Sequence, residues 1–495
     1  MHPILPTEYM KLIFHYIKKD DELLYFSLLV NRYWCKNVVT LLWACPFDSL
    51  NFHNIYKITP VYISSLEENE KNQLKILLVK NLYDQTSILK LIPINKPLFS
   101  YSIMLEEFSL KSLEKIVQSW ITLFRPDKSF EESRKHIMNI KEQIILFLFK
   151  LFIKSTNLKF LKIDSDQILN YCFDPDLHTN GQFLNISKLE FGYAAQHMLV
   201  KSINFIVKIS KLCKKINNLI VKVPAFGNSP EIKNSIILII NAQEKLKEFS
   251  LRSVDSWLEE IIEALQSQAN SLVSFNLECV NISESSLISL AKCKNLKNLI
   301  ILNYPRFNIR LRKNIKFKNL KRLYIKNPLL LNINMLNLKE LTLEVLTYEM
   351  MVLIIENCPN ITHFNLKNYR PSAHDLIFKD FIQKLHITHL TIKFLYSNSI
   401  ISESSILSKE FLPLSLKYLF VPSVVSFNTS IDKIASLKVF VLQGPCTEIT
   451  SSGEYSNGST FAVSQITSAE PLCLSDVTGV QDTRGSSVWF LSPKE

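Results

Sequence analysis

Apolar residues recur through the middle of the chain in one short pattern. It consists of an apolar residue, two variable positions, an apolar residue, one variable position and a third apolar residue. The first copy is Leu158/Leu161/Ile163 and the last is Leu437/Phe440/Leu442, and twelve copies lie roughly 18 to 30 residues apart. The copies between them begin at Ile186, Ile216, Leu246, Leu272, Leu296, Leu320, Leu338, Ile361, Ile387 and Leu416. A single strand-and-helix unit cannot bury its apolar face, whereas stacked neighbours can. The pattern therefore predicts an α/β solenoid over residues 158–443.

Helical spacing dominates the chain before these repeats. Residues 1–47 predict three short helices, the first after Thr7, the second through Leu23–Val30 and the third through Trp34–Trp43. Residues 48–157 predict a helical connector, for which degenerate early repeats are the alternative. A block of about 47 residues is marginal as an independent fold, so we expect it to lean on a partner or on the connector.

The composition changes after residue 443. Residues 444–495 hold five of the eight glycines, many Ser and Thr, and six acidic against two basic residues. We expect a disordered tail there, with an atypical exon or a gene-model artefact as the alternative.

Composition and charge narrow the class of protein. A net charge of +12 and a pI near 9.0 favour acidic partners. The nine cysteines are scattered and never spaced as C-x-x-C, which favours a reducing compartment. We also expect no secretory signal and no membrane span, and hence a cytoplasmic or nuclear protein.

Two parts of the chain each resemble a known family. The first block, residues 1–47, resembles an F-box through Leu5-Pro6-x-Glu8, the phrase Leu28-Leu29-Val30-Asn31-Arg32-x-Trp34 and the closing Leu42-Trp43. The repeats resemble the cysteine-containing leucine-rich type, because Cys213, Cys293 and Cys358 each lie three residues before their motif. Together they resemble an F-box/leucine-rich-repeat protein, the substrate receptor of an SCF-type ubiquitin ligase.

The resemblance implies two partners. The F-box would dock the Skp adaptor of the cullin ligase core, and the repeats would capture a protein target for ubiquitination. The residues that match the adaptor-binding motif are Leu5, Pro6, Ile13, Leu28, Leu29, Val30, Trp34, Leu42 and Trp43. Which of them face the adaptor and which form the core of the block is left open. The alternative is a protein-binding scaffold without a ligase role, whose first block caps the solenoid.

The target would bind the concave face. Strand alternation sends the variable positions of each motif to that face, and the candidates there are Arg322, Tyr324, Lys326, His363, Asn365, His389 and Tyr418. The basic stretch Arg306–Lys326, which contains no acidic residue, predicts a dock for an acidic or phosphorylated segment, with a solvated rim as the alternative. Nucleic-acid binding is a further alternative, but aromatic residues, on which bases would stack, are sparse in this stretch.

Candidate chemistry is scarce elsewhere. His363 and His389 share one slot of consecutive repeats, but no third ligand accompanies them, so we expect no metal site. Neither G-x-S-x-G, H-E-x-x-H nor a Gly-rich phosphate loop occurs. We expect a non-catalytic protein without a cofactor.

Overall fold

A computed structural model describes most of the chain and divides it into two compact units, residues 1–257 and 258–495. The described residues are 7–17, 21–47, 55–81, 97–123, 131–154, 157–163, 185–192, 199–223, 229–252, 257–278, 282–302, 315–326, 333–369, 375–394, 412–422, 439–447, 457–465, 477–481 and 487–491. The border between the units falls inside the run of repeats. A repeat contacts only its sequence neighbours, so such an array can divide between any two of them.

The first unit opens with three short helices, as the sequence predicts. They are α1 (Thr7–Ile17), α2 (Asp21–Leu28) and α3 (Arg32–Leu42). Met10, Phe14, Leu24 and Val38 form a small buried core between them. The α3 helix begins at Asn31, whose side-chain oxygen accepts a hydrogen bond from the Trp34 N–H at 2.9 Å.

The connector is helical and carries its own core. Its helices are η1 (Ile55–Lys57), α4 (Ile58–Ser64), α5 (Glu68–Asn81), η2 (Tyr101–Met104), α7 (Leu110–Thr122) and α8 (Glu131–Ile153). Phe47 packs against Tyr62, Phe108 and Phe152 at ring distances of 6.0 to 6.3 Å. The end of the first block is therefore part of the connector's core.

The repeats begin earlier than residue 158. Strand β1 (Glu107–Ser109) pairs in parallel with β2 (Phe160–Ile163). Leu105, Phe108 and Leu110 have the spacing of the repeat motif, and each is at most 1 % exposed. Early repeats were only the alternative for this segment, because this copy lies between two helical segments and the next copy begins only at Leu158.

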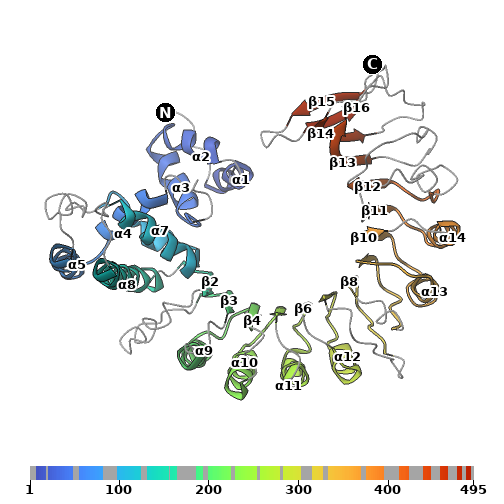
Figure 1. The fold of residues 1–495 in the computed structure, drawn as a ribbon, viewed down its shortest axis with the longest axis horizontal. Helices are drawn as coiled ribbons and strands as arrows, with labels where there is room; N and C mark the ends of the chain where they lie inside the picture. The colour runs from blue at the N-terminus through green and yellow to red at the C-terminus, as the bar shows by residue number, and fades with distance from the viewer. Residues whose placement is uncertain are drawn as a thin grey trace. The chain divides into compact units, whose positions relative to one another are not determined.

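Parallel strands continue through the first unit in chain order. After β2 come β3 (Lys188–Gly192), β4 (Asn218–Lys222) and β5 (Glu248–Arg252), each paired with the preceding strand. Helices α9 (Leu199–Leu212) and α10 (Pro230–Asn241) lie on one side of these strands (Figure 1).

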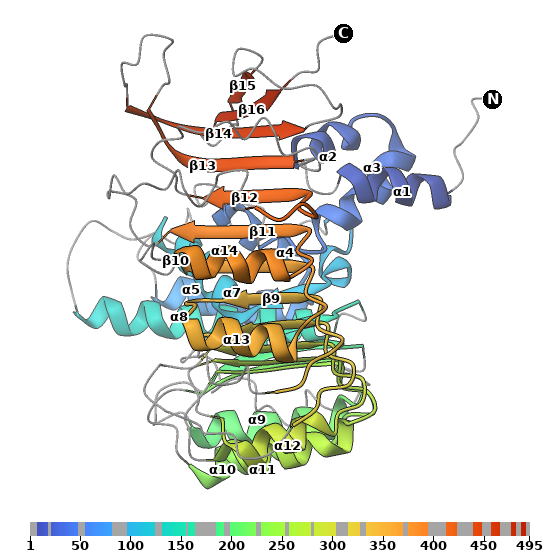
Figure 2. The ribbon, with the colours of Figure 1, turned by 90° about the vertical axis from the view of Figure 1, so that its right-hand side faces the viewer.

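The second unit repeats this arrangement. Its parallel strands are β6 (Ser274–Glu278), β7 (Asn298–Leu302), β8 (Arg322–Ile325), β9 (Glu340–Leu343), β10 (His363–Tyr369), β11 (His389–Phe394) and β12 (Tyr418–Pro422). The accompanying helices are α11 (Leu258–Ala264), η7 (Leu265–Gln268), α12 (Glu284–Ala291), α13 (Tyr348–Asn357) and α14 (Asp375–Lys384). Figure 2 shows β9 to β12 stacked in chain order behind α13 and α14. The first ten predicted motifs, from Leu158 to the copy at Ile387, have all three apolar residues at most 3 % exposed.

Neighbouring repeats are joined by a recurring hydrogen-bond pattern. At most of the described motifs, the carbonyl of the residue after the first motif position accepts two consecutive N–H groups of the next repeat. For example, Lys297 O accepts from Lys321 N and Arg322 N at 2.8 and 2.9 Å. Ala44, at the end of the first block, continues this pattern in the first unit. Its carbonyl accepts hydrogen bonds from Glu106 N and Glu107 N at 2.9 and 3.1 Å.

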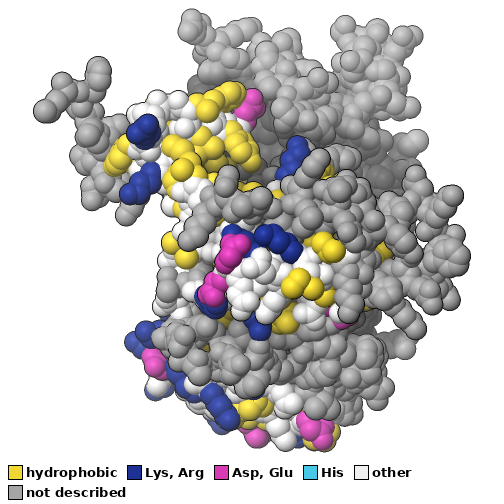
Figure 3. All heavy atoms as spheres, turned by 90° about the vertical axis from the view of Figure 1, so that its left-hand side faces the viewer, with side chains coloured by type: hydrophobic (Ala, Val, Ile, Leu, Met, Phe, Trp, Pro, Cys, Tyr) yellow, Lys and Arg dark blue, Asp and Glu magenta, His cyan; other side chains and the backbone are white. Residues whose placement is uncertain are grey.

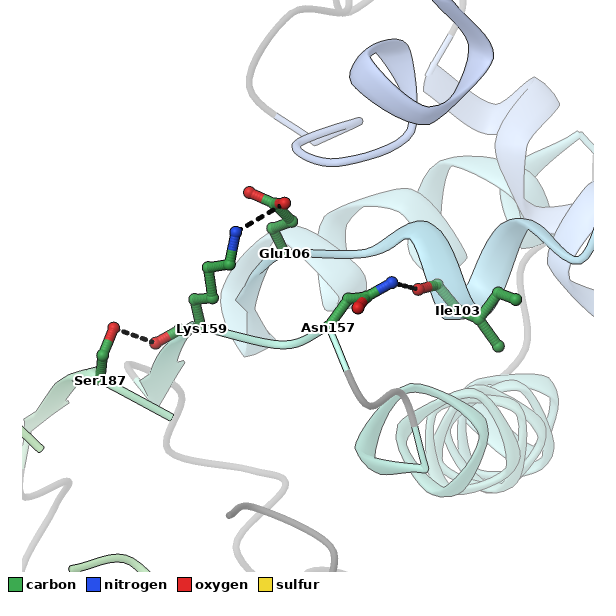
Figure 4. A network of polar contacts seen from close by, with 5 residues as sticks. All are labelled: Ile103, Glu106, Asn157, Lys159 and Ser187. Carbon is green, nitrogen blue, oxygen red and sulfur yellow. Dashed lines mark hydrogen bonds and ion pairs between the residues drawn. The ribbon is translucent and has the colours of Figure 1, made fainter. Parts of the chain in front are cut away.

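Asparagine side chains form a second set of hydrogen bonds between neighbouring repeats, which was not predicted from the sequence. We call these bonds the asparagine ladder. The residue before the first apolar position donates its side-chain amide to a carbonyl of the preceding repeat. These bonds are Asn157 to Ile103 O (Figure 4), Asn295 to Asn270 O, Asn319 to Lys294 O, Asn337 to Lys318 O and Asn360 to Leu336 O, at 2.5 to 2.8 Å. The recurrent Asn-Leu or Asn-Ile dipeptide at the start of the motif was the available signal.

The last strands lie where the sequence predicts a disordered tail. Strand β13 (Val439–Thr447) pairs in parallel with β12 and antiparallel with β14 (Asn457–Gln465), while β15 (Val477–Gln481) and β16 (Ser487–Leu491) form an antiparallel pair. Among the described helices of the chain, none is both long and apolar enough to cross a bilayer.

Candidate functional site

The outer surface of the first block is unusually apolar for so small a unit. On α1, Tyr9, Leu12 and Tyr16 form one stripe at helical spacing and are 59, 58 and 82 % exposed. Leu23, Tyr25, Phe26, Leu29 and Val30, on and just after α2, are 48 to 82 % exposed. Hydrophobic side chains gather over this block in Figure 3. We call these eight side chains the apolar surface of the first block.

The nine residues predicted to bind the adaptor divide into four groups. Leu29 and Val30 belong to the apolar surface. Ile13, Leu28, Trp34 and Leu42 are partly buried against the core of the block. Leu5 and Pro6 lie outside the described residues, and the ninth, Trp43, faces the connector.

Two of these tryptophans have structural contacts that explain their position. Trp34 meets Phe14 edge to face with ring centroids 5.4 Å apart. Trp43 packs against Tyr62 and Tyr101 of the connector at 5.3 and 4.1 Å. Both rings are therefore held within the first unit.

Six members of the apolar surface were not predicted as adaptor-binding: Tyr9, Leu12, Tyr16, Leu23, Tyr25 and Phe26. The signal for the α1 stripe was present, since apolar residues occupy more than half of the circumference of Thr7–Ile17. An apolar face that wide is normally covered along its whole width. Here the small core of the block covers only the side that carries Met10 and Phe14.

The strand register of the second unit aligns the predicted target-binding residues in rows. One row runs Arg322, Glu340, His363, His389 and Tyr418, and a second runs Tyr324, Thr342, Asn365, Thr391 and Phe420. Both rows occupy the face opposite the buried apolar residues, as strand alternation predicts. Lys326 is exposed just after β8.

Three rings stack along the first row. His363 and His389 lie 3.9 Å apart with planes 11° from parallel, and His389 and Tyr418 lie 4.1 Å apart at 14°. Next to them, Arg322 Nε pairs with Glu340 Oε2 at 3.0 Å. The ring faces of the stack are therefore turned toward one another, and their edges are turned outward.

Threonines orient the two imidazoles. Each Nδ1 lies 2.9 Å from the hydroxyl of the preceding residue, Thr362 or Thr388. Each hydroxyl also donates to a backbone carbonyl, Lys339 O at 3.3 Å and Thr362 O at 3.1 Å. A hydroxyl has one proton to donate, so it accepts from the imidazole, and Nδ1 carries the hydrogen. Burial, the neighbouring His363 and the charge of Lys417 lower the pKa of His389 below its usual value.

A polar network lies at the ends of strands β8 to β10. The Tyr324 hydroxyl donates to Glu344 Oε1 and accepts from Lys367 Nζ, both at 2.6 Å, and Lys367 also lies over the Tyr324 ring at 4.2 Å. Burial, followed by the hydrogen bond and charge of Glu344, raises the pKa of Tyr324 well above its usual value. Asn365 donates to Thr342 at 3.2 Å. The polar side chains of this face thus largely satisfy one another.

The first unit carries an ionic cluster on its strand face. Glu190 Oε1 lies 2.6 Å from Lys222 Nζ and 3.4 Å from Lys162 Nζ. Burial opposes ionisation of the carboxyl, but the hydrogen bond from Lys222 and the charges of both lysines prevail and lower the pKa of Glu190.

The three motif cysteines are structural. Cys213, Cys293 and Cys358 are buried, and their N–H groups close the last turns of α9, α12 and α13 at 2.8 to 3.0 Å. Burial raises the pKa of each thiol, to about 12, 11 and 12. Within the described ranges, no three or more His, Cys, Asp or Glu side chains come close enough to hold a metal ion.

Comparisons with known proteins add little to these observations. No protein-family model matches the chain, and no curated protein matches it. Among solved structures, a chain described as "Crystal structure of TLR13-ssRNA13 complex" is similar over 61 % of this chain and 41 % of its own length, at 16 % identity and a TM-score of 0.29. The repeat architecture therefore rests on the strand register and burial described above.

Proposed function

We propose that this chain is the substrate receptor of an SCF-type ubiquitin ligase. The first block would dock the Skp adaptor, and the strand face of the repeats would hold a protein target. The observation that carries the proposal is the apolar surface of the first block, where eight large hydrophobic side chains are 48 to 82 % exposed. A contiguous apolar patch on a soluble protein usually marks an interaction site.

The repeats support the second half of the proposal. Their buried positions form a continuous core, so their outer positions are free to vary without loss of the fold. A long strand face with charged, aromatic and amide groups suits recognition of another protein.

The chain itself would perform no chemistry. A receptor of this kind holds its target close to a ubiquitin-carrying enzyme and thereby raises the effective concentration of the target's lysines. No residue of this chain would touch the bond that is transferred.

Co-purification with a Skp adaptor tests the proposal. We expect Phe26→Ala and Leu29→Ala each to weaken adaptor binding by about 2 kcal/mol, roughly 30-fold, if they are central anchors. Ile76→Ala on α5, 67 % exposed and outside the first block, is the matched control. Trp34 is unsuitable, because its loss would also disturb the core of the block. Full adaptor binding by the Phe26→Ala/Leu29→Ala double variant would contradict the proposal.

A repeat scaffold without a ligase role is the second candidate, and one observation favours it. Ala44 continues the hydrogen-bond pattern of the repeats, and Phe47 packs in the connector's core, so the first block also caps the repeats of the first unit. Under this alternative no adaptor binds. Deletion of residues 1–47 would not separate the two functions, because either one predicts a loss of stability.

A further inference from the structure

The positive charge of the chain is concentrated in one segment. Between residues 285 and 339 there is no Asp or Glu, while thirteen basic residues occur: Lys292, Lys294, Lys297, Arg306, Arg310, Arg312, Lys313, Lys316, Lys318, Lys321, Arg322, Lys326 and Lys339. The positive charge of this segment alone exceeds the net charge of the whole chain, which is +12. Arg306, Arg310, Arg312 and Lys313 lie outside the described residues, whereas the lysines of the segment other than Lys313 lie within them.

The strand register places three of these lysines on consecutive rungs. Lys321 N donates to Lys297 O at 2.8 Å, and Lys339 N donates to Lys321 O at 2.9 Å. All three side chains are exposed at the start of strands β7, β8 and β9. We call Lys297, Lys321 and Lys339 the lysine ladder.

Two more lysines flank the ladder. The carbonyls of Lys294 and Lys318, three residues before Lys297 and Lys321, accept the Asn319 and Asn337 side chains, so they too lie on consecutive repeats. Both are exposed. The ladder is bounded, since the equivalent positions on either side are Val273 and Thr362.

Like charges stacked in this way oppose folding. Neighbouring strands lie about 4.8 Å apart, and like charges directly opposite each other are destabilising. The adjacent position of the same strands is different, because Arg322 there is neutralised by Glu340. No ladder lysine forms an ion pair with any residue that the structure describes. An external anion is therefore the group that would relieve the repulsion.

We infer that the lysine ladder is a docking site for an acidic helical segment of a partner protein. Side chains at i, i+3 or i+4, and i+7 of a helix are about 5 to 6 Å apart, close to the rung spacing of the ladder. Same-side residues of an extended segment are about 6.8 Å apart. An extended segment would therefore fall out of register with the lysines over three rungs. The inference rests on the proposed target-binding role of the repeats and names the chemistry of the target.

A nucleic acid fits this surface less well. Proteins that bind single strands supply open aromatic faces for the bases. In the described part of the strand face, His363, His389 and Tyr418 cover one another, and Lys367 lies over Tyr324. Among the residues that the structure describes beside the ladder, Arg322 is already paired with Glu340.

Fluorescence anisotropy on the full chain tests the inference. The probe is a labelled helical peptide with Glu at i, i+4 and i+7, compared with an isomer of the same composition in which these glutamates are scrambled. We expect tighter binding of the helical peptide, weakened at least tenfold by Lys297→Gln/Lys321→Gln/Lys339→Gln. The same triple variant should unfold at a slightly higher temperature, because the repulsion is gone.

The control removes the same charge elsewhere. Lys215→Gln/Lys245→Gln/Lys247→Gln changes three exposed repeat lysines of the first unit, beside Glu244 and Glu248, and should bind the peptide as the wild type does. Equal losses in both triple variants, equal binding of the scrambled isomer, or tighter binding of a fifteen-nucleotide single-stranded RNA would each overturn the inference. The Phe26→Ala/Leu29→Ala variant should retain peptide binding, so failure of the adaptor proposal and failure of this one remain distinguishable.

Discussion

The first block and the repeats differ in how completely they bury their apolar residues. In the repeats, motif residues such as Leu341 and Phe364 are fully buried, and the positions between them are polar or ionic. In the first block, Tyr16 and Leu29 are each 82 % exposed. A stack of repeats gains core with every added unit, whereas three short helices enclose too little volume to cover all their apolar groups. The uncovered apolar side chains of the first block are thus the part of the chain that most requires a partner.

Truncation of a buried leucine should give the largest effect. We expect Leu341→Ala in β9 to lower the free energy of unfolding of the second unit by about 2 to 5 kcal/mol, because it leaves a cavity. Leu29→Ala in the first block should change the stability of the first unit by less than about 0.5 kcal/mol. Urea unfolding followed by circular dichroism measures both. Similar losses in the two variants would remove the contrast between the regions.

The contact between the first block and the connector should have the next largest effect. Trp43→Ala removes a half-buried ring that packs on Tyr62 and Tyr101, so we expect a loss of about 2 kcal/mol in the first unit. Trp43→Phe, which keeps an aromatic ring, should lose about half as much unfolding free energy as Trp43→Ala. An unchanged unfolding midpoint in Trp43→Ala would mean that the Trp43 ring does not couple the stability of the first block to that of the connector.

The asparagine ladder should give a smaller effect. Asn319→Ala deletes the hydrogen bond to Lys294 O, and we expect a loss of about 1 kcal/mol. Lys318→Ala, the exposed neighbour, serves as the control and should stay within about 0.5 kcal/mol of the wild type. If the two variants unfold alike, the ladder contributes no stability of its own.

The smallest effect should appear only in acid. The pKa of Glu190 is lowered in the folded state, so its ionic cluster stabilises the protein above the usual glutamate pKa of 4.5. That stability is lost as the pH falls through the folded-state pKa. The difference in unfolding free energy between wild type and Glu190→Gln should therefore shrink between pH 6 and pH 3. A difference that stays constant over this range would show that the cluster does not act through the charge of Glu190.

Sequence periodicity predicted the repeats well because each repeat depends mainly on its neighbours. The alternation of Leu341 and Leu343 with Glu340 and Thr342 already indicates which side of the strand is buried. The copy at Leu105 was hidden because its neighbours are helices. The candidate site was predicted less completely: Leu29 and Val30 are exposed, while Trp34 and Leu42 belong largely to the core.

The sequence by itself determined the existence of the repeats, the side of each strand that is buried and the three helices of the first block, since these follow from local spacing. The tertiary structure alone decided which apolar side chains of the first block remain uncovered, that His363, His389 and Tyr418 stack, and that three lysines meet on consecutive rungs. These features depend on which residues of different segments lie opposite one another. That register is set by packing and hydrogen bonds between segments, and no single segment contains it.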